Sequence, residues 1–523
     1  MIHSLALAAL LATASEDADL LIRGGTLVDG TGGAARRADV AIRGDRIVAV
    51  GDLGDTKAAR VIDAAGLVVA PGFIDLHTHS DSGITAEATR ANRNYLTQGV
   101  TTIVTGNCGG GPTDVAAMFA TIDQHRAGTN VIHLIPHGSL RAKVVGQENR
   151  PATPEELAEM KALVAREMKA GTWGMSTGLI YTPGCFAPTD ELVELARVVA
   201  EHGGIYASHI RGEGDDTLIS SITEAIRIGR EAKLPVHISH LKASGRAAWG
   251  MMPRACRLIE DARAAGQAVT ADQYPYTASS TSLAAMIVPA ADREGGGDEL
   301  AKRLADATRG PTLRDRIARE LAERGGADTI RIASFAKNRS WQGKSLAEIA
   351  AAESRPAHEV AIEILEQGGA SAVSFSMSED DVRLAMQKPY VATASDGSAR
   401  VPDETVPHPR SYGCFSRKIG RYAIADKVVS LEHAVRSASG LPADILRLPD
   451  RGYVRPGYFA DLVILDPAEF RDVATFDKPH QYSSGIRFVF VSGRAAIDAG
   501  EFTGTLNGSA LRLAPRGTAE PSK

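Results

Sequence analysis

The sequence has few cysteines, no marked excess of charge and no long apolar run. Its four cysteines, Cys108, Cys185, Cys256 and Cys414, are too few and too scattered for a disulfide framework. The 58 basic and 63 acidic residues give a net charge of -5, which does not suggest nucleic acid or an anionic membrane as a partner. No apolar run is long enough to cross a membrane. P-loop and dinucleotide fingerprints are also absent, and Ser176 lies in GMSTG rather than in a GxSxG nucleophile motif.

What the sequence does contain predicts one large and one small domain. A chain of 523 residues with 44% apolar residues is too long for one ordinary core. Short strand patterns fill residues 18–68, including a hairpin pattern around Gly44-Asp45, and similar patterns return in residues 441–502. We interpret these two ends as one β-sandwich built around a central domain.

Between the two ends, strand and helix patterns alternate over residues 69–440. This alternation predicts an α/β fold, a (β/α)8 TIM-like barrel of parallel strands. A capping box formed by Thr153 and Glu156 opens one helix, and Thr189 starts another. Eight candidate strands are expected: Phe73–His79, Thr101–Gly106, Val131–Pro136, Thr172–Thr177, Gly204–His209, Pro235–His240, Ala268–Tyr274 and Tyr390–Asp396.

Three segments stand apart from this alternation. Residues from about 283 to 345 exceed what one connection needs, and we interpret them as an insertion over the barrel mouth. Residues 503–523 are expected to form a flexible tail. Residues 1–17 resemble a short signal segment, which favours a periplasmic or secreted protein. The lack of Lys or Arg before the apolar part leaves a cytoplasmic location as the alternative.

Metal-ligand side chains lie at the ends of several predicted strands. His77 and His79 leave one strand together, and side chains two apart on a strand point to the same side. A single histidine at a strand end is more often a hydrogen-bonded core residue, but six such residues at matching ends make that explanation improbable. Imidazole, thiolate and carboxylate suit a catalytic zinc ion at the barrel mouth. Besides His77 and His79, the six residues at strand ends are Cys108, His209, His240 and Asp396.

Longer motifs extend this interpretation over most of the chain. They are LLIRGGTLVDGTG (20–32), PGFIDLHTHSD (71–81), GVTTIVTGNCGGG (99–111), GMSTGLIYTPG (174–184), YASHIRGE (206–213), ISHLKASG (238–245), DQYPYTASST (272–281), ASDGS (394–398) and HPRSYG (408–413). In these segments the sequence resembles the amidohydrolase superfamily and, within it, the N-acyl-D-amino-acid deacylases, also called D-aminoacylases. The resemblance covers roughly residues 18–502.

The resemblance implies a role for each matching residue. One zinc ion would be held tightly by Cys108, His209 and His240, while His77 and His79 would line a second, weaker metal position. Asp396 would act as general base and then general acid as a metal-activated water attacks the acyl carbon. The product would be a carboxylate and a free D-amino acid. The residues implied to hold the substrate's α-carboxylate are Lys242, Tyr274, Ser280 and Arg410.

Other functions remain open at this point. A dipeptidase that acts on D-residue peptides, or another metal-dependent amidase of the superfamily, would use a similar site. A cyclic-amide hydrolase usually has a carboxylated lysine on a mid-barrel strand, and the fourth strand offers only Met175-Ser176-Thr177. A non-catalytic scaffold on the same fold is the remote alternative. The expected partner is a small N-acyl amino acid or short peptide. The sequence leaves undetermined its side chain and acyl group, the role of His137 and the oligomeric state.

Overall fold

The central domain is a closed barrel of parallel strands. The computed structural model describes residues 18–514. Two groups of strands, β6–β7–β8 and β9–β10–β11–β12–β13–β17, make up the wall. Within each group every two neighbouring strands pair in parallel. Leu134 alone separates β8 from β9, and a parallel bridge between Thr78 and Gly397 joins β6 to β17. The strands are β6 (Phe73–Asp75), β7 (Val100–Thr105), β8 (Asn130–His133), β9 (Ile135–Pro136), β10 (Gly174–Gly178), β11 (Ile205–His209), β12 (Val236–Ile238), β13 (Val269–Gln273) and β17 (Val391–Thr393).

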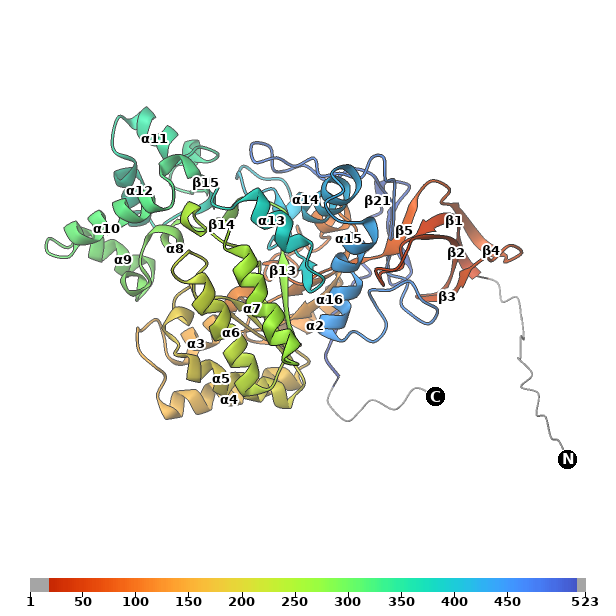
Figure 1. The fold of residues 1–523 in the computed structure, drawn as a ribbon, viewed down its shortest axis with the longest axis horizontal. Coiled ribbons are helices and arrows are strands. Elements are labelled where there is room, and N and C mark those ends of the chain that lie inside the picture. The colour runs from red at the N-terminus through yellow and green to blue at the C-terminus, as the bar shows by residue number, and fades with distance from the viewer. Residues whose placement is uncertain (1–17, 515–523) are drawn as a thin grey trace.

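The predicted barrel is confirmed, with β8 and β9 together forming the third strand. The first strand is shorter than expected, because its ladder ends at Asp75 and leaves His77 and His79 in the loop beyond it. Helices cover the outside of the wall (Figure 1). They are α1 (Arg93–Leu96), α2 (Val115–His125), α3 (His137–Val144), α4 (Pro154–Lys169), α5 (Thr189–Glu201), α6 (Leu218–Ala232), α7 (Met252–Ala264), α13 (Glu379–Met386), α14 (Arg410–Ser416), α15 (Leu431–Ala438) and α16 (Gly440–Leu446).

Helix starts follow the sequence signals only in part. The Thr153 hydroxyl accepts from the Glu156 N–H and the Glu156 carboxylate accepts from the Thr153 N–H, so the predicted capping box opens α4. Helix α5 does begin at Thr189, but Pro188 is its N-cap and makes no side-chain cap. The Thr189 hydroxyl donates instead to Glu224 of the neighbouring helix α6.

The insertion is a separate layer between β13 and β17, and it is longer than the expected 283–345. It continues to Ser374, because β16 (Ser371–Ser374) pairs antiparallel with both β14 (Ser279–Ser282) and β15 (Ile330–Ser334). Its helices share their own apolar core and project from the barrel at the end opposite the β-module (Figure 1). They are α8 (Leu283–Ile287), α9 (Gly297–Ala305), α10 (Gly310–Glu323), α11 (Leu346–Glu353) and α12 (Ala357–Glu366).

The two ends of the chain form one β-module, as Figure 1 shows in red and blue. Its strands follow the continuous path β21–β20–β19–β18–β5–β1–β2–β3, with β4 also paired to β1, around a shared apolar core. The expected boundary at residue 69 falls inside β5, which pairs antiparallel with β18. The strands are β1 (Ala18–Leu27), β2 (Arg36–Arg43), β3 (Arg46–Gly51), β4 (Ala58–Asp63), β5 (Val68–Pro71), β18 (Leu462–Leu465), β19 (Ile486–Val491), β20 (Arg494–Asp498) and β21 (Glu501–Phe502).

The segment after β21 is docked rather than flexible as far as it is described. The Gly508 N–H donates to the Ala127 carbonyl, the Leu511 N–H to Val131, and the Leu513 N–H to Gly171. These bonds satisfy backbone groups at the start of β8 and before β10, so the expected fraying does not occur there. Residues 515–523 and the signal-like residues 1–17 lie outside the described chain. Within the described part, no helix is both long and apolar enough to cross a bilayer.

Candidate active site

The Cys108 thiol is held by a tight turn that follows β7. Cys108 has φ 52°, a left-handed conformation that few non-glycine residues adopt. A Cβ at Gly106 would lie 2.0 Å from the Leu134 carbonyl oxygen, so only glycine fits there. The Ser176 hydroxyl donates to the Gly106 carbonyl and accepts from the Gly109 N–H at 3.0 Å. The turn therefore fixes the thiol at the carboxyl end of the barrel.

Two imidazoles face this thiol from neighbouring strands. His209 ends β11, and His240 lies two residues beyond β12 with φ 37°. Cys108 Sγ lies 3.6 Å from His209 Nδ1 and 3.7 Å from His240 Nε2, and the two nitrogens are 2.9 Å apart. Ligands of a tetrahedral zinc ion are separated by about 3.4 Å for two nitrogens and about 3.6 Å for sulfur and nitrogen. The donor set and the two sulfur–nitrogen distances fit a zinc ion, while the two nitrogens lie closer together than they would as its ligands.

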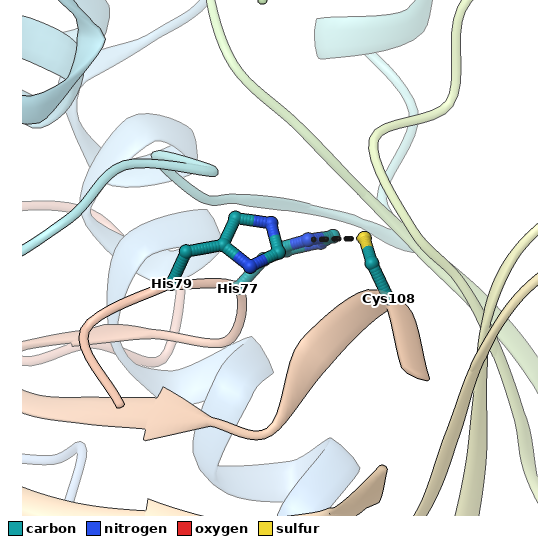
Figure 2. A group of neighbouring side chains, drawn as sticks. All are labelled: His77, His79 and Cys108. Carbon is teal, nitrogen blue, oxygen red and sulfur yellow. Dashed lines mark hydrogen bonds between the residues drawn. The ribbon is translucent and has the colours of Figure 1, made fainter. Parts of the chain in front are cut away.

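A second group of donors lies beside the first. His77 Nε2 is 3.2 Å from Cys108 Sγ, and Figure 2 shows the His77 and His79 rings on the same side of that sulfur. The Asp396 carboxylate is 2.9 Å from His79 Nε2 and 3.5 Å from His77 Nε2. Donors of His77, His79 and Cys108, and those of His77, His240 and Asp396, form two further groups with all atoms within 4.8 Å. All six predicted metal-site residues therefore meet at one place.

Charges in this cluster compensate one another. Burial alone would raise the pKa of the Cys108 thiol, but His77 and the two other facing imidazoles hold that pKa well below its usual value. Burial would likewise raise the pKa of Asp396, yet Arg410 and His77 keep it well below the ordinary range. Both groups are therefore anionic near neutral pH. An anionic sulfur and an anionic carboxylate in a buried site are suited to a cation.

Glu213 is a site residue that the sequence interpretation missed. Its carboxylate lies 2.6 Å from Lys242 Nζ and 3.2 Å from His240 Nδ1. Lys242, a predicted substrate ligand, also approaches His240 Nδ1 at 2.8 Å. Burial alone would raise the pKa of Glu213, but Lys242 and the imidazoles lower it strongly. Its position four residues after His209, within YASHIRGE, was the available signal.

Asp272 is the second missed residue. It accepts hydrogen bonds from the His240 N–H at 2.6 Å and from His237 Nε2 at 2.8 Å, and it lies 3.4 Å from His77 Nδ1. One buried carboxylate at the end of β13 thus orients two loops that carry metal-type ligands. Asp272 also fits the pattern that identified the other ligands, because it is a polar residue near the end of a barrel strand.

The predicted substrate residues line the same mouth. Tyr274 Oη is buried without a hydrogen-bond partner, and its ring lies beside Lys242 and Arg410. Arg410 forms an ion pair with Asp396 at 2.7 Å and donates to the Ser280 carbonyl at 3.2 Å. The Ser280 hydroxyl donates to Ala372 within the insertion. Arg410 is therefore bound to the candidate catalytic carboxylate, in addition to any role toward substrate.

Two cavities flank this cluster. One of about 310 Å³ is lined by Lys242, Tyr274 and both zinc-type histidines, and another of about 430 Å³ by Cys108, Arg410 and several glycines. Tyr181 borders both, and its hydroxyl lies 2.9 Å from Thr281 Oγ1 of the insertion. Together the cavities give a small molecule room on either side of the donor cluster.

His137 lies outside these cavities. Its ring is fully buried, with Nε2 3.6 Å from the Glu191 carboxylate, which itself pairs with Arg141 at 3.0 Å. The backbone of the next residue, Gly138, lines the second cavity. Of the two roles left open by the sequence, packing is the one that this position supports.

A parallel barrel with histidine, thiolate and carboxylate donors at the carboxyl ends of its strands is the architecture of a metal-dependent hydrolase. Comparison with known proteins agrees. Residues 60–497 match the model of an amidohydrolase family. The D-aminoacylase of Alcaligenes xylosoxydans xylosoxydans is 37% identical over 95% of this chain and 98% of its own length.

Two solved structures are similar over nearly their whole length. A D-aminoacylase with a binuclear metal centre, activated by one metal and attenuated by the second, shares 35% identity and a TM-score of 0.81 over 94% of this chain and 99% of its own. An N-acyl-D-glutamate deacylase from Bordetella bronchiseptica, complexed with zinc and a phosphonate inhibitor, shares 33% and 0.82 over 95% and 100%. The chain belongs to the amidohydrolase family and, within it, to the N-acyl-D-amino-acid deacylases.

Proposed function

We propose that this protein is a zinc-dependent hydrolase that removes the acyl group from N-acyl-D-amino acids. The observation that carries the proposal is the triangle of Cys108 Sγ, His209 Nδ1 and His240 Nε2. Its two sulfur–nitrogen sides of 3.6 and 3.7 Å match the ligand spacing of tetrahedral zinc, and its nitrogen–nitrogen side of 2.9 Å is shorter than that spacing. The relatives named above act on this substrate class, and the chain aligns with them over nearly its full length.

The metal ligands in this proposal are those of the sequence interpretation. Cys108, His209 and His240 would hold one zinc ion tightly. His77 and His79 would line the second, weaker position, with the Asp396 carboxylate beside it. When bound, zinc supplies Lewis-acid chemistry, since it polarises the acyl carbonyl and lowers the pKa of water.

Asp396 carries the proton in the proposed reaction. Its low pKa leaves the carboxylate free to accept a proton from the attacking water. Arg410, at 2.7 Å, fixes the carboxylate's direction, and Asp396 then returns the proton to the departing amine nitrogen. The amide C–N bond breaks, and the products are a carboxylate and a free amino acid.

Lys242, Tyr274, Ser280 and Arg410 are proposed to hold the substrate's α-carboxylate. Lys242 and Arg410 supply the charge, with Lys242 Nζ 5.7 Å and Arg410 Cζ 5.0 Å from the centre of the Tyr274 ring. A carboxylate fixed between them would present the amide of only one Cα configuration to the metal-site residues.

A turnover assay of the zinc-loaded protein tests the proposal. It offers paired N-acetyl-D and N-acetyl-L amino acids (Met, Leu, Phe and Glu) and measures the released amine. Hydrolysis of D members only is the expected result. Hydrolysis of the L members as well as the D members would contradict the handedness, and activity only on dipeptides with a C-terminal D-residue would replace the deacylase by a dipeptidase.

A further inference from the structure

A cavity of about 610 Å³ lies at the amino ends of the barrel strands, and it is larger than either cavity at the mouth. It is lined by loops that precede β8 and β10, by the β-module and by the segment after β21. Four of the lining side chains are arginines, and two are acids. The arginines are Arg126, Arg451, Arg494 and Arg512, and the acids are Asp45 and Asp450.

Both acids already face a cation that lies outside the lining. The Arg46 guanidinium is 2.8 Å from the Asp450 carboxylate and 3.8 Å from that of Asp45. One of the four arginines, the buried Arg451, is paired with the Asp461 carboxylate. These charges therefore compensate one another without a ligand.

The other three arginines are not all paired. Arg512 contacts the Asp123 carboxylate at 2.6 Å. Neither Arg126 nor Arg494 forms an ion pair with a carboxylate of the described chain. The half-buried Arg126 guanidinium donates to the Asn507 carbonyl at 2.9 Å, and Arg494 is exposed. A neutral carbonyl does not compensate a full charge, so two cationic groups of this cavity are available to an anion.

A row of hydrogen bonds brings the cations to one part of the lining. Arg451 donates to Ser492 Oγ at 3.4 Å, and Asn507 Nδ2 donates to the Ser492 carbonyl at 3.2 Å. Arg126 joins the other end of this row through the Asn507 carbonyl. Arg494, the first residue of β20, follows Ser492 by two positions. The guanidinium groups thus come from the loop after α16, from the β-module and from the end of α2.

Arg126 has a backbone conformation that arginine rarely adopts. It lies directly after α2 with φ 58° and ψ 163°, and its N–H donates to the Ile122 carbonyl. Glycine reaches this region of φ and ψ at little cost, whereas other residues are strained there. The backbone would suit glycine better, so a role of the side chain is the reason for an arginine at this position. An anion bound by the guanidinium supplies that role.

We propose that this cavity binds the phosphate group of a small phosphorylated molecule through Arg126 and Arg494, with Arg451 beside them. A guanidinium group binds two oxygens of an oxyanion at once. A tetrahedral phosphate accepts from guanidinium groups that approach from several sides, which suits this arrangement better than a flat carboxylate. The volume leaves room for the rest of a small molecule. Because the bound group contacts the barrel and the β-module together, it stabilises the folded chain and takes no part in hydrolysis.

Calorimetric titration of the zinc-loaded full chain tests the proposal. The probes are inorganic phosphate and glycerol 3-phosphate, in chloride buffer of constant ionic strength so that general screening does not change. Two charge-assisted contacts predict a Kd of about 1 mM or lower. At 20 mM of either probe the folding equilibrium constant should then rise about 20-fold, which scanning calorimetry detects as a higher Tm. Succinate, which has two carboxylates and no tetrahedral group, should bind at least about tenfold more weakly.

Variants locate the effect in this cavity. Arg494→Gln and Arg126→Gly should each raise the Kd for phosphate by at least about tenfold, because each removes one charged donor. In phosphate-free buffer Arg126→Gly is not expected to melt below the unmodified protein, since glycine relieves the backbone. Arg319→Gln removes an exposed arginine of α10 that does not line the cavity, and this matched control should bind phosphate unchanged.

Four results overturn the proposal. The first is that neither phosphate nor glycerol 3-phosphate binds the unmodified protein or raises its Tm at constant ionic strength. The second is binding that survives both Arg494→Gln and Arg126→Gly, which would place the anion at the metal site or elsewhere. Equal affinity for succinate would contradict the assignment of a phosphate group. A lower Tm of Arg126→Gly with unchanged phosphate affinity would show that Arg126 serves the structure alone.

Discussion

The carboxyl ends and the amino ends of the barrel strands carry different kinds of residue and serve different purposes. At the carboxyl ends, Cys108, His240 and Asp396 have φ values of 52°, 37° and 51°, a conformation that costs folding energy for non-glycine residues. At the amino ends, backbone groups are paired with the segment that follows β21, and the Trp173 indole donates to the Leu511 carbonyl at 2.8 Å. A cavity of about 610 Å³ there is lined by no histidine or cysteine. The metal-type donors are concentrated at the carboxyl end. The amino end, where Arg126 and Lys233 also have a φ of 58° ahead of β8 and β12, carries packing and hydrogen bonds that serve stability.

The comparison predicts that changes at the mouth act on activity or metal binding. Changes elsewhere should act on stability alone. The largest effect is expected for Asp396→Asn, which removes the proton acceptor but preserves the shape of the side chain. Turnover should fall by about 10³-fold, in the range of general acid–base catalysis. Zinc content by elemental analysis and the circular dichroism spectrum should not change. Retained turnover would mean that another group carries the proton.

The next effect concerns Glu213. In Glu213→Gln, the amide replaces the carboxylate that faces His240 Nδ1 at 3.2 Å, so the ring loses its charged acceptor. Loss of such a partner typically weakens metal binding by about 10–100-fold. Competition with a chromophoric chelator measures the zinc affinity directly. Glu231→Gln, at an exposed ion pair with Arg227, is the control and should leave the affinity as it was.

A buried lysine away from the mouth should affect stability and its pH dependence only. Lys418 lies in a π-helical segment, Arg417–Ala425, and donates to the Met386 carbonyl at 3.0 Å. Burial lowers its pKa from 10.5 to about 7. Between pH 7 and 10.5 the unfolded chain therefore binds a proton that the folded chain does not, and stability rises with pH by up to about 1.4 kcal/mol per unit from this group.

Lys418→Met removes that contribution. Urea unfolding at a series of pH values between 7 and 10 should give a flatter dependence for the variant, which should also be the more stable protein at pH 7. Parallel curves for the two proteins would show that Lys418 keeps its ordinary pKa in the folded state. kcat/KM on N-acetyl-D-amino acids should be the same for both.

The smallest effect is expected at the amino ends of the strands. Trp173→Phe keeps an aromatic ring but removes the indole donor to Leu511 and leaves part of the buried volume of the indole empty. The free energy of unfolding should fall by about 1–3 kcal/mol, from the lost hydrogen bond, the unpaired carbonyl and the smaller ring. Activity at 25 °C should not change. A loss of turnover as large as that of Asp396→Asn would contradict the division between the two ends.

Sequence patterns predicted the barrel because each strand carries its own local signal. The apolar run before His77 and the polar residues that end later strands are examples, and in a closed barrel all such ends meet. Glu213 was not predicted because its role depends on which loop lies opposite, which one chain segment does not reveal. Asp272 fits the strand-end pattern of the other ligands and was missed although its own segment carried the signal. The C-terminal limit of the insertion was not predicted, because β16 is only four residues long and forms by pairing with β14 and β15, which lie far away in sequence.

The tail illustrates the same limit. Its Gly-, Ala- and Pro-containing composition is typical of a flexible end, and local pattern gave no reason to expect pairing with Ala127 and Val131. Two buried arginines show the same limit. Arg141 pairs with the Glu191 carboxylate, whereas Arg293 of the insertion donates to the Val288 carbonyl, and the sequence alone does not distinguish them.

Because the β-module is built from both ends of the chain, it affects the order in which the parts of the chain fold during synthesis. Strand β5 emerges from the ribosome before the barrel, whereas its partner β18 emerges only after the barrel. The two strands pair directly, for example at Val69 and Ile464. The edge of β5 that β18 covers must therefore stay unpaired while the barrel strands are being made. Loop closure across the barrel is inexpensive only once the barrel is compact. The catalytic domain is therefore expected to fold first and the β-module to be completed last. A stalled or truncated chain that lacks β18 would expose the unpaired edge of β5, which can pair with another chain and aggregate.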